Sequence, residues 1–82
     1  MGPVPAPRNL PAFPEARRVK PKTGRGDGSR RHRWKDSDAI YEWDAQHGSV
    51  EKYTLRGRDQ GQFDPNTGAQ QKVPDPSRRI EP

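Results

Sequence analysis

Two stretches of the chain, 39–43 and 49–56, place their large hydrophobic residues among polar ones with a spacing of two, as in Tyr41 and Trp43 or Tyr53 and Leu55. In the first, Tyr41 and Trp43 share one face of an extended chain, and their neighbours point the other way. A period of two is typical of β-strands. The residues between the two stretches, 44–48, include Asp and Gly, which are common in turns. We therefore predict that the two stretches form a β-hairpin.

Turn signals and short strand patterns continue beyond the hairpin. Residues 57–61 predict a turn, and 62–64 a short strand. In 64–68, Asp-Pro-Asn-Thr-Gly combines a proline that presets φ with a glycine that tolerates positive φ, which predicts another turn. A last short strand is expected over 69–73, before the prolines of 74–76 end regular pairing. The predicted fold class is mainly β: a small, highly twisted antiparallel sheet with a short N-terminal helical or irregular segment.

The N-terminal third differs in composition, because it is rich in proline and glycine. Closely spaced prolines in 1–16 disfavour a helix, although a short helical turn over 14–18 is compatible with proline at a first helical position. Glycines make 20–29 a flexible stretch. We predict a Pro/Gly-rich basic linker or arm over 1–29 and a folded domain over 30–82. A linker of this kind suggests the terminal piece of a longer protein.

Composition limits the size of the core. Only 26% of the 82 residues are hydrophobic and 33% are charged, which on average approaches the disordered class. Most of the large apolar residues fall in the last fifty or so positions, so a thin core is expected there. The chain has no cysteine, which excludes disulfides and thiolate metal sites. No apolar run approaches the length of a membrane span or of the core of a signal peptide.

The net charge of +5 favours a polyanionic partner such as nucleic acid. Basic residues gather between positions 17 and 35, and those nearest the predicted sheet are candidates for RNA contacts: Arg30, Arg31, Arg33 and Lys35. Trp34 lies within this run and is a candidate for stacking on a base. A solvated basic arm, with Trp34 as a core anchor, is the structural alternative.

Asp44, His47 and Glu51 are close together in the sequence. A carboxylate beside an imidazole stabilises the protonated imidazolium, and a second carboxylate supplies a base. RNA cleavage through the 2′-hydroxyl needs both groups, whereas charge-paired surface residues are the simpler interpretation. Tyr53 shares a predicted strand face with Glu51 and is a candidate for substrate binding, either by packing on a base or by holding Glu51. His32 and His47 lie on separate segments, and no known ligand motif occurs, so neither a metal nor a cofactor is predicted.

The chain resembles the cytotoxic ribonuclease domain of the ribosome-inactivating colicins and cloacin. The resemblance covers about 30–80 and rests on three blocks: Ile-Tyr-Glu-Trp-Asp at 40–44 with Gln-His-Gly at 46–48, Glu51 and Tyr53; Gly-Gln-Phe-Asp-Pro at 61–65 with Thr-Gly at 67–68; and Pro-Asp-Pro at 74–76 with Arg78 and Ile80. A basic run that ends in Trp34 precedes these blocks, as in the family.

The resemblance implies a twisted antiparallel sheet and a metal-independent endoribonuclease. Such domains cleave small-subunit (16S) ribosomal RNA once, in the decoding region, and so block translation. Asp44, His47, Glu51 and Arg78 match the family's catalytic positions, and Tyr53 matches an aromatic residue beside them. Two departures are visible: family members often carry a further glutamate where this chain has serine at position 49, and the C-terminal tail is less basic and aromatic.

The resemblance also implies a biological setting. The toxin is expected to be secreted, or delivered from the cell surface, as part of a larger protein, either a colicin or a contact-dependent inhibition effector. It would act in the target-cell cytoplasm. An acidic cognate immunity protein is the expected partner, besides the ribosomal RNA. The alternatives are a non-catalytic RNA-binding module, or a ribonuclease of the same fold that acts on tRNA.

Overall fold

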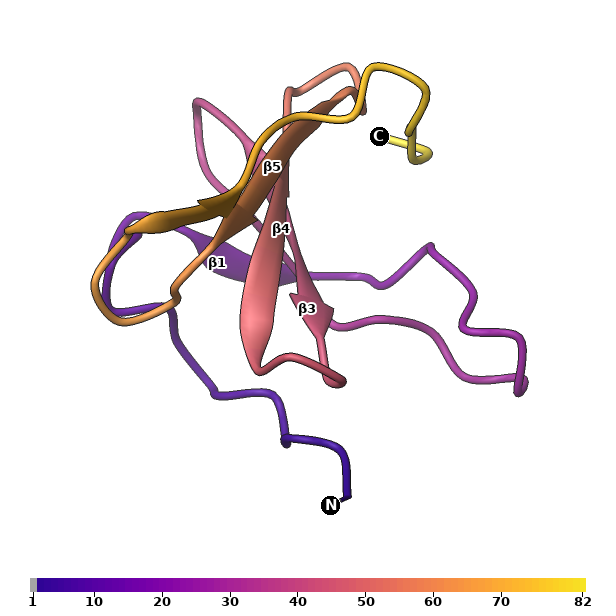
Figure 1. Ribbon diagram of the computed structural model, residues 1–82. Coiled ribbons are helices and arrows are strands. Elements are labelled where there is room, and N and C mark those ends of the chain that lie inside the picture. The colour runs from indigo at the N-terminus through magenta and orange to yellow at the C-terminus, as the bar shows by residue number, and fades with distance from the viewer. Residues whose placement is uncertain (1) are drawn as a thin grey trace.

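The structure, a computed structural model that describes residues 2–82, is a six-stranded antiparallel sheet in sequence order, β1-β2-β3-β4-β5-β6. Its strands are β1 (Arg17–Val19), β2 (Arg33–Lys35), β3 (Ile40–Asp44), β4 (Ser49–Tyr53), β5 (Asp59–Phe63) and β6 (Gln70–Lys72). The strand direction turns strongly between β1 and β5 (Figure 1). The mainly β, twisted antiparallel class is therefore confirmed.

The predicted hairpin is β3–β4, with Ile40 opposite Tyr53 and Asp44 opposite Ser49. Strand β4 ends at Tyr53, earlier than expected, because the chain turns at 54–57. The turn expected at 57–61 is wrong, since most of that range belongs to β5.

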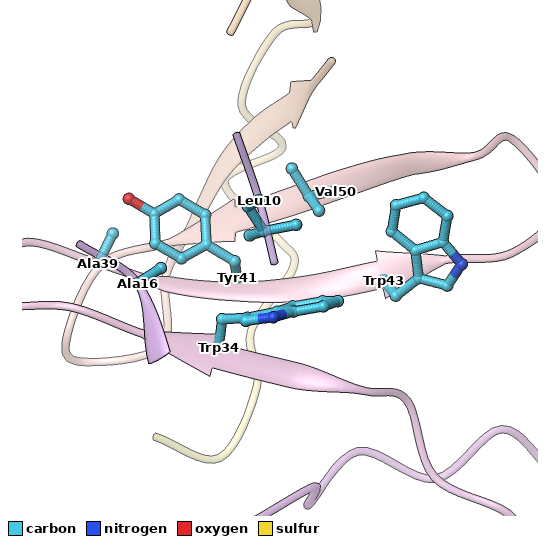
Figure 2. Packing of buried hydrophobic residues seen from close by; sticks show 7 residues of the cluster. All are labelled: Leu10, Ala16, Trp34, Ala39, Tyr41, Trp43 and Val50. Atoms are coloured by element: carbon cyan, nitrogen blue, oxygen red, sulfur yellow. The ribbon is translucent and has the colours of Figure 1, made fainter. Parts of the chain in front are cut away.

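One face of the sheet is apolar, because alternate residues of β2, β3 and β4 point to the same side. Trp34, Tyr41, Trp43 and Val50 form its centre, and Leu10 from the N-terminal segment covers them (Figure 2). Leu10 is 1% exposed and Val50 is fully buried. The aromatic rings of Trp34 and Trp43 meet edge to face, with their centroids 6.4 Å apart.

The segment expected to be a linker contributes to this core. The main-chain N–H of Val4 donates to the carbonyl of Ala45, and the indole of Trp43 donates to the carbonyl of Val4. The indole of Trp34 donates to the carbonyl of Arg8 in the same way. The segment therefore lies across the sheet and satisfies both buried indole N–H groups.

No helix forms among residues 2–82, so the helical turn considered for 14–18 is absent. Arg17–Val19 instead pair with Arg33–Lys35 as β1 and β2, because the sheet offers this segment an edge to pair with. Accordingly, no helix of the described chain is long and apolar enough to cross a membrane.

Candidate active site

The face of the sheet opposite the core carries the polar and charged side chains. Register places Glu42 of β3 opposite Glu51 of β4, and Glu51 opposite Gln62 of β5. Asp44 lies two residues beyond Glu42 on the same face, which makes it a diagonal neighbour of Glu51, typically about 7–8 Å away. Strand pairing alone therefore places the two candidate carboxylates side by side.

The turn between β3 and β4 positions His47. Asp44 Oδ1 accepts the main-chain N–H groups of Gln46 (3.0 Å) and His47 (3.4 Å), and Gly48 closes the turn at a φ of 65°. The same pattern recurs at 64–68, where Asp64 Oδ1 accepts two N–H groups and a glycine follows at the fifth position. Local sequence thus accounts for the place of His47 near the tip of the turn.

Asp44 and His47 form a close pair. The Nδ1 atom of His47 lies 2.6 Å from Asp44 Oδ2; the Asp44 side chain is 10% exposed and that of His47 is 46% exposed. Burial opposes the ionisation of Asp44. The hydrogen bond and charge of His47, with the N–H groups of the turn, outweigh burial and hold the pKa of Asp44 below its usual value. The carboxylate therefore stays ionised and keeps Nδ1 as a donor, which leaves the outer ring nitrogen of His47 free to act on a ligand.

Glu51 is the centre of a second cluster. Its Oε2 atom lies 2.7 Å from Arg78 Nη2 and accepts the hydroxyl of Tyr53 at 3.0 Å. Its other oxygen lies 3.8 Å from Arg31 Nη1. Burial and the charge of Glu51 both raise the pKa of Tyr53, so the phenol remains a hydrogen-bond donor.

Arg78 reaches Glu51 from the C-terminal tail, which folds back over β5. The main-chain N–H of Asp75 donates to Asp59 Oδ2, and the N–H of Asp59 donates to the carbonyl of Arg78. A turn then brings the N–H of Arg78 to the carbonyl of Asp75. Beside Glu51 and Arg78 lies an open pocket of about 230 Å³, also lined by Gln62. The Pro-Asp-Pro segment therefore sets the position of a cation beside the buried carboxylate.

Three of the predicted substrate contacts, Arg33, Trp34 and Tyr53, are buried in the structure. Arg33 is 2% exposed and donates through Nε and Nη2 to Glu42 Oε2, at 3.1 and 2.8 Å. Trp34 is fully buried in the core, so its ring has no face free for a base. Arg33 and Trp34 stabilise the sheet and cannot contact RNA in this structure.

Tyr53 is also fully buried, and it holds Glu51 without facing solvent. Arg30 and Lys35 are exposed, and Arg31 is partly buried against Glu51. Arg30, Arg31 and Lys35 remain the candidates for RNA contacts.

Gln62 belongs to the site but was missed in the sequence. Its Nε2 donates to Asp44 Oδ2 at 3.0 Å, and the residue is 4% exposed. No motif identifies a glutamine for this purpose, and only the register between β4 and β5 brings it to this face. Among residues 2–82, no group of three or more His, Cys, Asp or Glu side chains is placed to hold a metal ion.

Comparison with known proteins identifies the family. The chain matches the family model described as Cytotoxic over residues 4–81. The chain belongs to this family. It is 44% identical to cloacin, 43% identical to Colicin-E6 and 42% identical to Colicin E3, all from Escherichia coli, over 95% of its length. It spans about 15% of the length of each of these relatives. The resemblance to the colicin and cloacin toxin domain is therefore confirmed, and the match includes the N-terminal segment from residue 4 onward.

Proposed function

We propose that this protein is a bacterial toxin endoribonuclease that cleaves small-subunit (16S) ribosomal RNA in the decoding region and thereby blocks translation. The observation that carries the proposal is the pairing of two units on one sheet face. Glu51 lies 2.7 Å from Arg78, and the Asp44–His47 pair lies on the adjacent strand and turn. Membership of the Cytotoxic family supports the same reading.

The proposed chemistry begins at Glu51. Its carboxylate takes the proton of a ribose 2′-hydroxyl, and the 2′-oxygen attacks the adjacent phosphorus. Arg78 and Tyr53 both contact Oε2 at hydrogen-bond distance, whereas Oε1 has Arg31 only at 3.8 Å, so Oε1 is the oxygen that accepts this proton. A general base of this kind typically contributes about 10²–10⁴ in rate.

His47 completes the reaction as the general acid. As the bond from phosphorus to the 5′-oxygen breaks, His47 gives a proton to that oxygen. Asp44 keeps Nδ1 protonated, so the proton leaves from the other ring nitrogen, Nε2, of a side chain that is 46% exposed. The products are a 2′,3′-cyclic phosphate and a 5′-hydroxyl, and no metal is required.

Arg78 supplies electrostatic stabilisation. Its side chain is 41% exposed and lines the open pocket beside Glu51, where the phosphate would gain negative charge. A preorganised donor of this kind is commonly worth about 3–4 kcal/mol of barrier. Arg30, Arg31 and Lys35 would bind flanking RNA phosphates and make the affinity dependent on salt.

The proposed setting follows from the relatives. The domain would be the toxic part of a larger protein that is secreted or delivered from the cell surface and acts in the target-cell cytoplasm. An acidic immunity protein would protect the producing cell, because opposite charge accelerates the capture of a domain with a net charge of +5.

Product chemistry provides the test. Ribosomes treated with the domain should yield one small-subunit fragment pair with a 2′,3′-cyclic phosphate and a 5′-hydroxyl, and Arg78→Ala should reduce the rate at least about a hundredfold. A product with a free 3′-hydroxyl would refute the mechanism. Cleavage confined to tRNA would refute the target, and RNA binding without cleavage would indicate a non-catalytic module.

A further inference from the structure

We propose that Gln62 is a positioning residue that fixes the Asp44 carboxylate for His47 and couples it to the strand that carries Glu51. The inference rests on the proposed function, because it gives a role to a further residue of the same site. Its structural part, the control of the Asp44–His47 pair, is testable even if the RNA target is different.

The Asp44 carboxylate is held at both oxygens. Oδ1 accepts the N–H of Gln46 at 3.0 Å. Oδ2 accepts Nδ1–H of His47 at 2.6 Å and Nε2–H of Gln62 at 3.0 Å. Among residues 2–82, His47 and Gln62 are the side chains that hydrogen-bond to Asp44. Rotation of the carboxylate would break the Gln62 bond, so this bond helps to keep Oδ2 aimed at His47.

Gln62 also links the two halves of the site. Its main chain pairs with Glu51 in the β4–β5 ladder, and its side chain crosses to Asp44 on β3. Gln62 is 4% exposed, and burying an amide without a hydrogen-bond partner costs folding free energy. Asp44 is the acceptor for its N–H. The position of the proton donor is therefore tied to the strand that carries the base.

The bond has a chemical consequence for His47. Burial opposes the ionisation of Asp44, but His47 and the main-chain N–H groups of the turn hold the pKa of Asp44 below its usual value. The Gln62 amide donates one more hydrogen bond to the ionised carboxylate. An ionised Asp44 keeps the proton on Nδ1. When His47 has given up its other proton, the ring remains as the Nδ1–H tautomer that Asp44 stabilises. Without the amide, Asp44 would be easier to protonate and freer to turn away.

Other charged groups surround this bond. The hollow beside Asp44 is also lined by Arg25 and Arg31, and His47 contacts the carboxylate directly. The charged residues that share the pocket of Gln62 are two cations and three carboxylates: Lys72, Arg78, Glu51, Asp59 and Asp75. A new carboxylate at position 62 would therefore meet several negative charges besides Asp44.

Gln62→Glu is the most direct test, because it keeps the shape of the side chain and replaces the amide N–H donor with a carboxyl group. Below its pKa the introduced carboxyl can donate O–H to Asp44 Oδ2, as the amide does. Above it the two carboxylates repel each other, and neighbouring carboxylates share a proton up to an elevated pH. The ratio of variant to parent cleavage rates should therefore fall at least about tenfold as pH rises from about 5 to about 8.

Two further variants provide the controls. Gln62→Met removes the donor without adding charge and should lower the rate about tenfold or more, with little dependence of that ratio on pH. Gln60→Glu adds the same charge to the same strand away from Asp44 and should follow the parent. If Gln62→Glu follows the parent across this pH range, or if Gln60→Glu reproduces its profile, the proposal is wrong.

An NMR measurement separates this inference from the proposed function. The Nδ1–H proton of His47 should give a protected downfield signal in the parent and exchange faster in Gln62→Met, with folding checked by circular dichroism. Unchanged exchange in a folded Gln62→Met would overturn the positioning role. If the parent cleaves no ribosomal RNA but the His47 signal responds as expected, the proposed function fails and the role of Gln62 stands.

Discussion

Replacing Glu42 tests whether Arg33 is a structural residue, as the structure indicates, or an RNA ligand. Glu42 has no solvent exposure, and Arg33 is 2% exposed. Three donor groups converge on Glu42 Oε2: Arg33 Nε at 3.1 Å, Arg33 Nη2 at 2.8 Å and the hydroxyl of Thr23 at 2.6 Å. Glu42→Gln preserves the side-chain volume but leaves the guanidinium buried without a counter-charge.

The expected loss follows from this burial. Breaking a buried ion pair by removing one partner costs about 3–5 kcal/mol of unfolding free energy. In a domain of this size that corresponds to a fall in melting temperature of roughly 12–40 °C. Glu81→Gln is the matched control, because it removes the same charge from a pair with Lys22 that is 3.6 Å long and 72% exposed at the glutamate. That pair should be worth about 0–1 kcal/mol.

Urea unfolding followed by tryptophan fluorescence measures both variants, since Trp34 and Trp43 lie in the core. Arg33→Met combined with Glu42→Gln should recover part of the stability, because it removes the unpaired charge. The folded double variant should bind ribosomes as well as the parent. A loss of unfolding free energy in Glu42→Gln within about 1 kcal/mol of that in Glu81→Gln would contradict a structural role for Arg33. A clear loss of ribosome affinity in the stable double variant would contradict it as well.

Three further predictions concern the core and the site. Leu10→Ala should cost about 2–5 kcal/mol in the same urea assay, because Leu10 is 1% exposed; a cost near zero would make the N-terminal segment a loose arm. Tyr53→Phe should lower the cleavage rate about tenfold without unfolding, because Glu51 loses a 3.0 Å hydrogen bond, and an unchanged rate would contradict this. The folded-state pKa of Asp44 is depressed, so its stabilisation is present above about pH 4 and is lost as pH falls through the folded pKa. The stability difference between the parent and Asp44→Asn should shrink correspondingly below about pH 4, and a constant difference in pH-dependent unfolding would contradict the assignment.

The central hairpin could be predicted because the residues that specify its strands and turn are neighbours in the sequence. Tyr41 and Trp43 are spaced two residues apart with Glu42 between them, and the turn from Asp44 to Gly48 is specified by its own residues. The turn at 64–68, which follows β5, could be predicted for the same reason, because its Asp, Pro and Gly residues are typical of turns. Strands β1 and β2 were not visible, because three-residue strands carry too short a pattern and their pairing is between distant segments.

The role of the proline-rich segment also depends on distant contacts. Leu10 is an isolated apolar residue among prolines, and only the finished sheet offers the surface that buries it. A polypeptide with many prolines resembles a linker by composition, although its extended backbone is well suited to lying across an apolar face.

In the candidate site, Asp44, His47 and Glu51 were predicted from residue type and spacing and Arg78 from the family resemblance, whereas their neighbours were not predicted. The Asp44–His47 contact is within reach of a short turn, and Glu51 with Tyr53 follows from alternation. The place of Gln62 depends on strand register, and the burial of Arg33 depends on Glu42 across the sheet. Charge composition indicates that the chain is basic, but it cannot tell which arginines face RNA.

The most direct test of the account is to incubate intact ribosomes with the domain in EDTA and to map the ends of all ribosomal RNAs. His47→Ala and Glu51→Gln are assayed beside the parent. We expect a single cut in the decoding region of the small-subunit RNA, made by the parent without divalent metal and lost in both variants. Cleavage retained by either variant, or no cut by the parent, would contradict the proposed ribonuclease site.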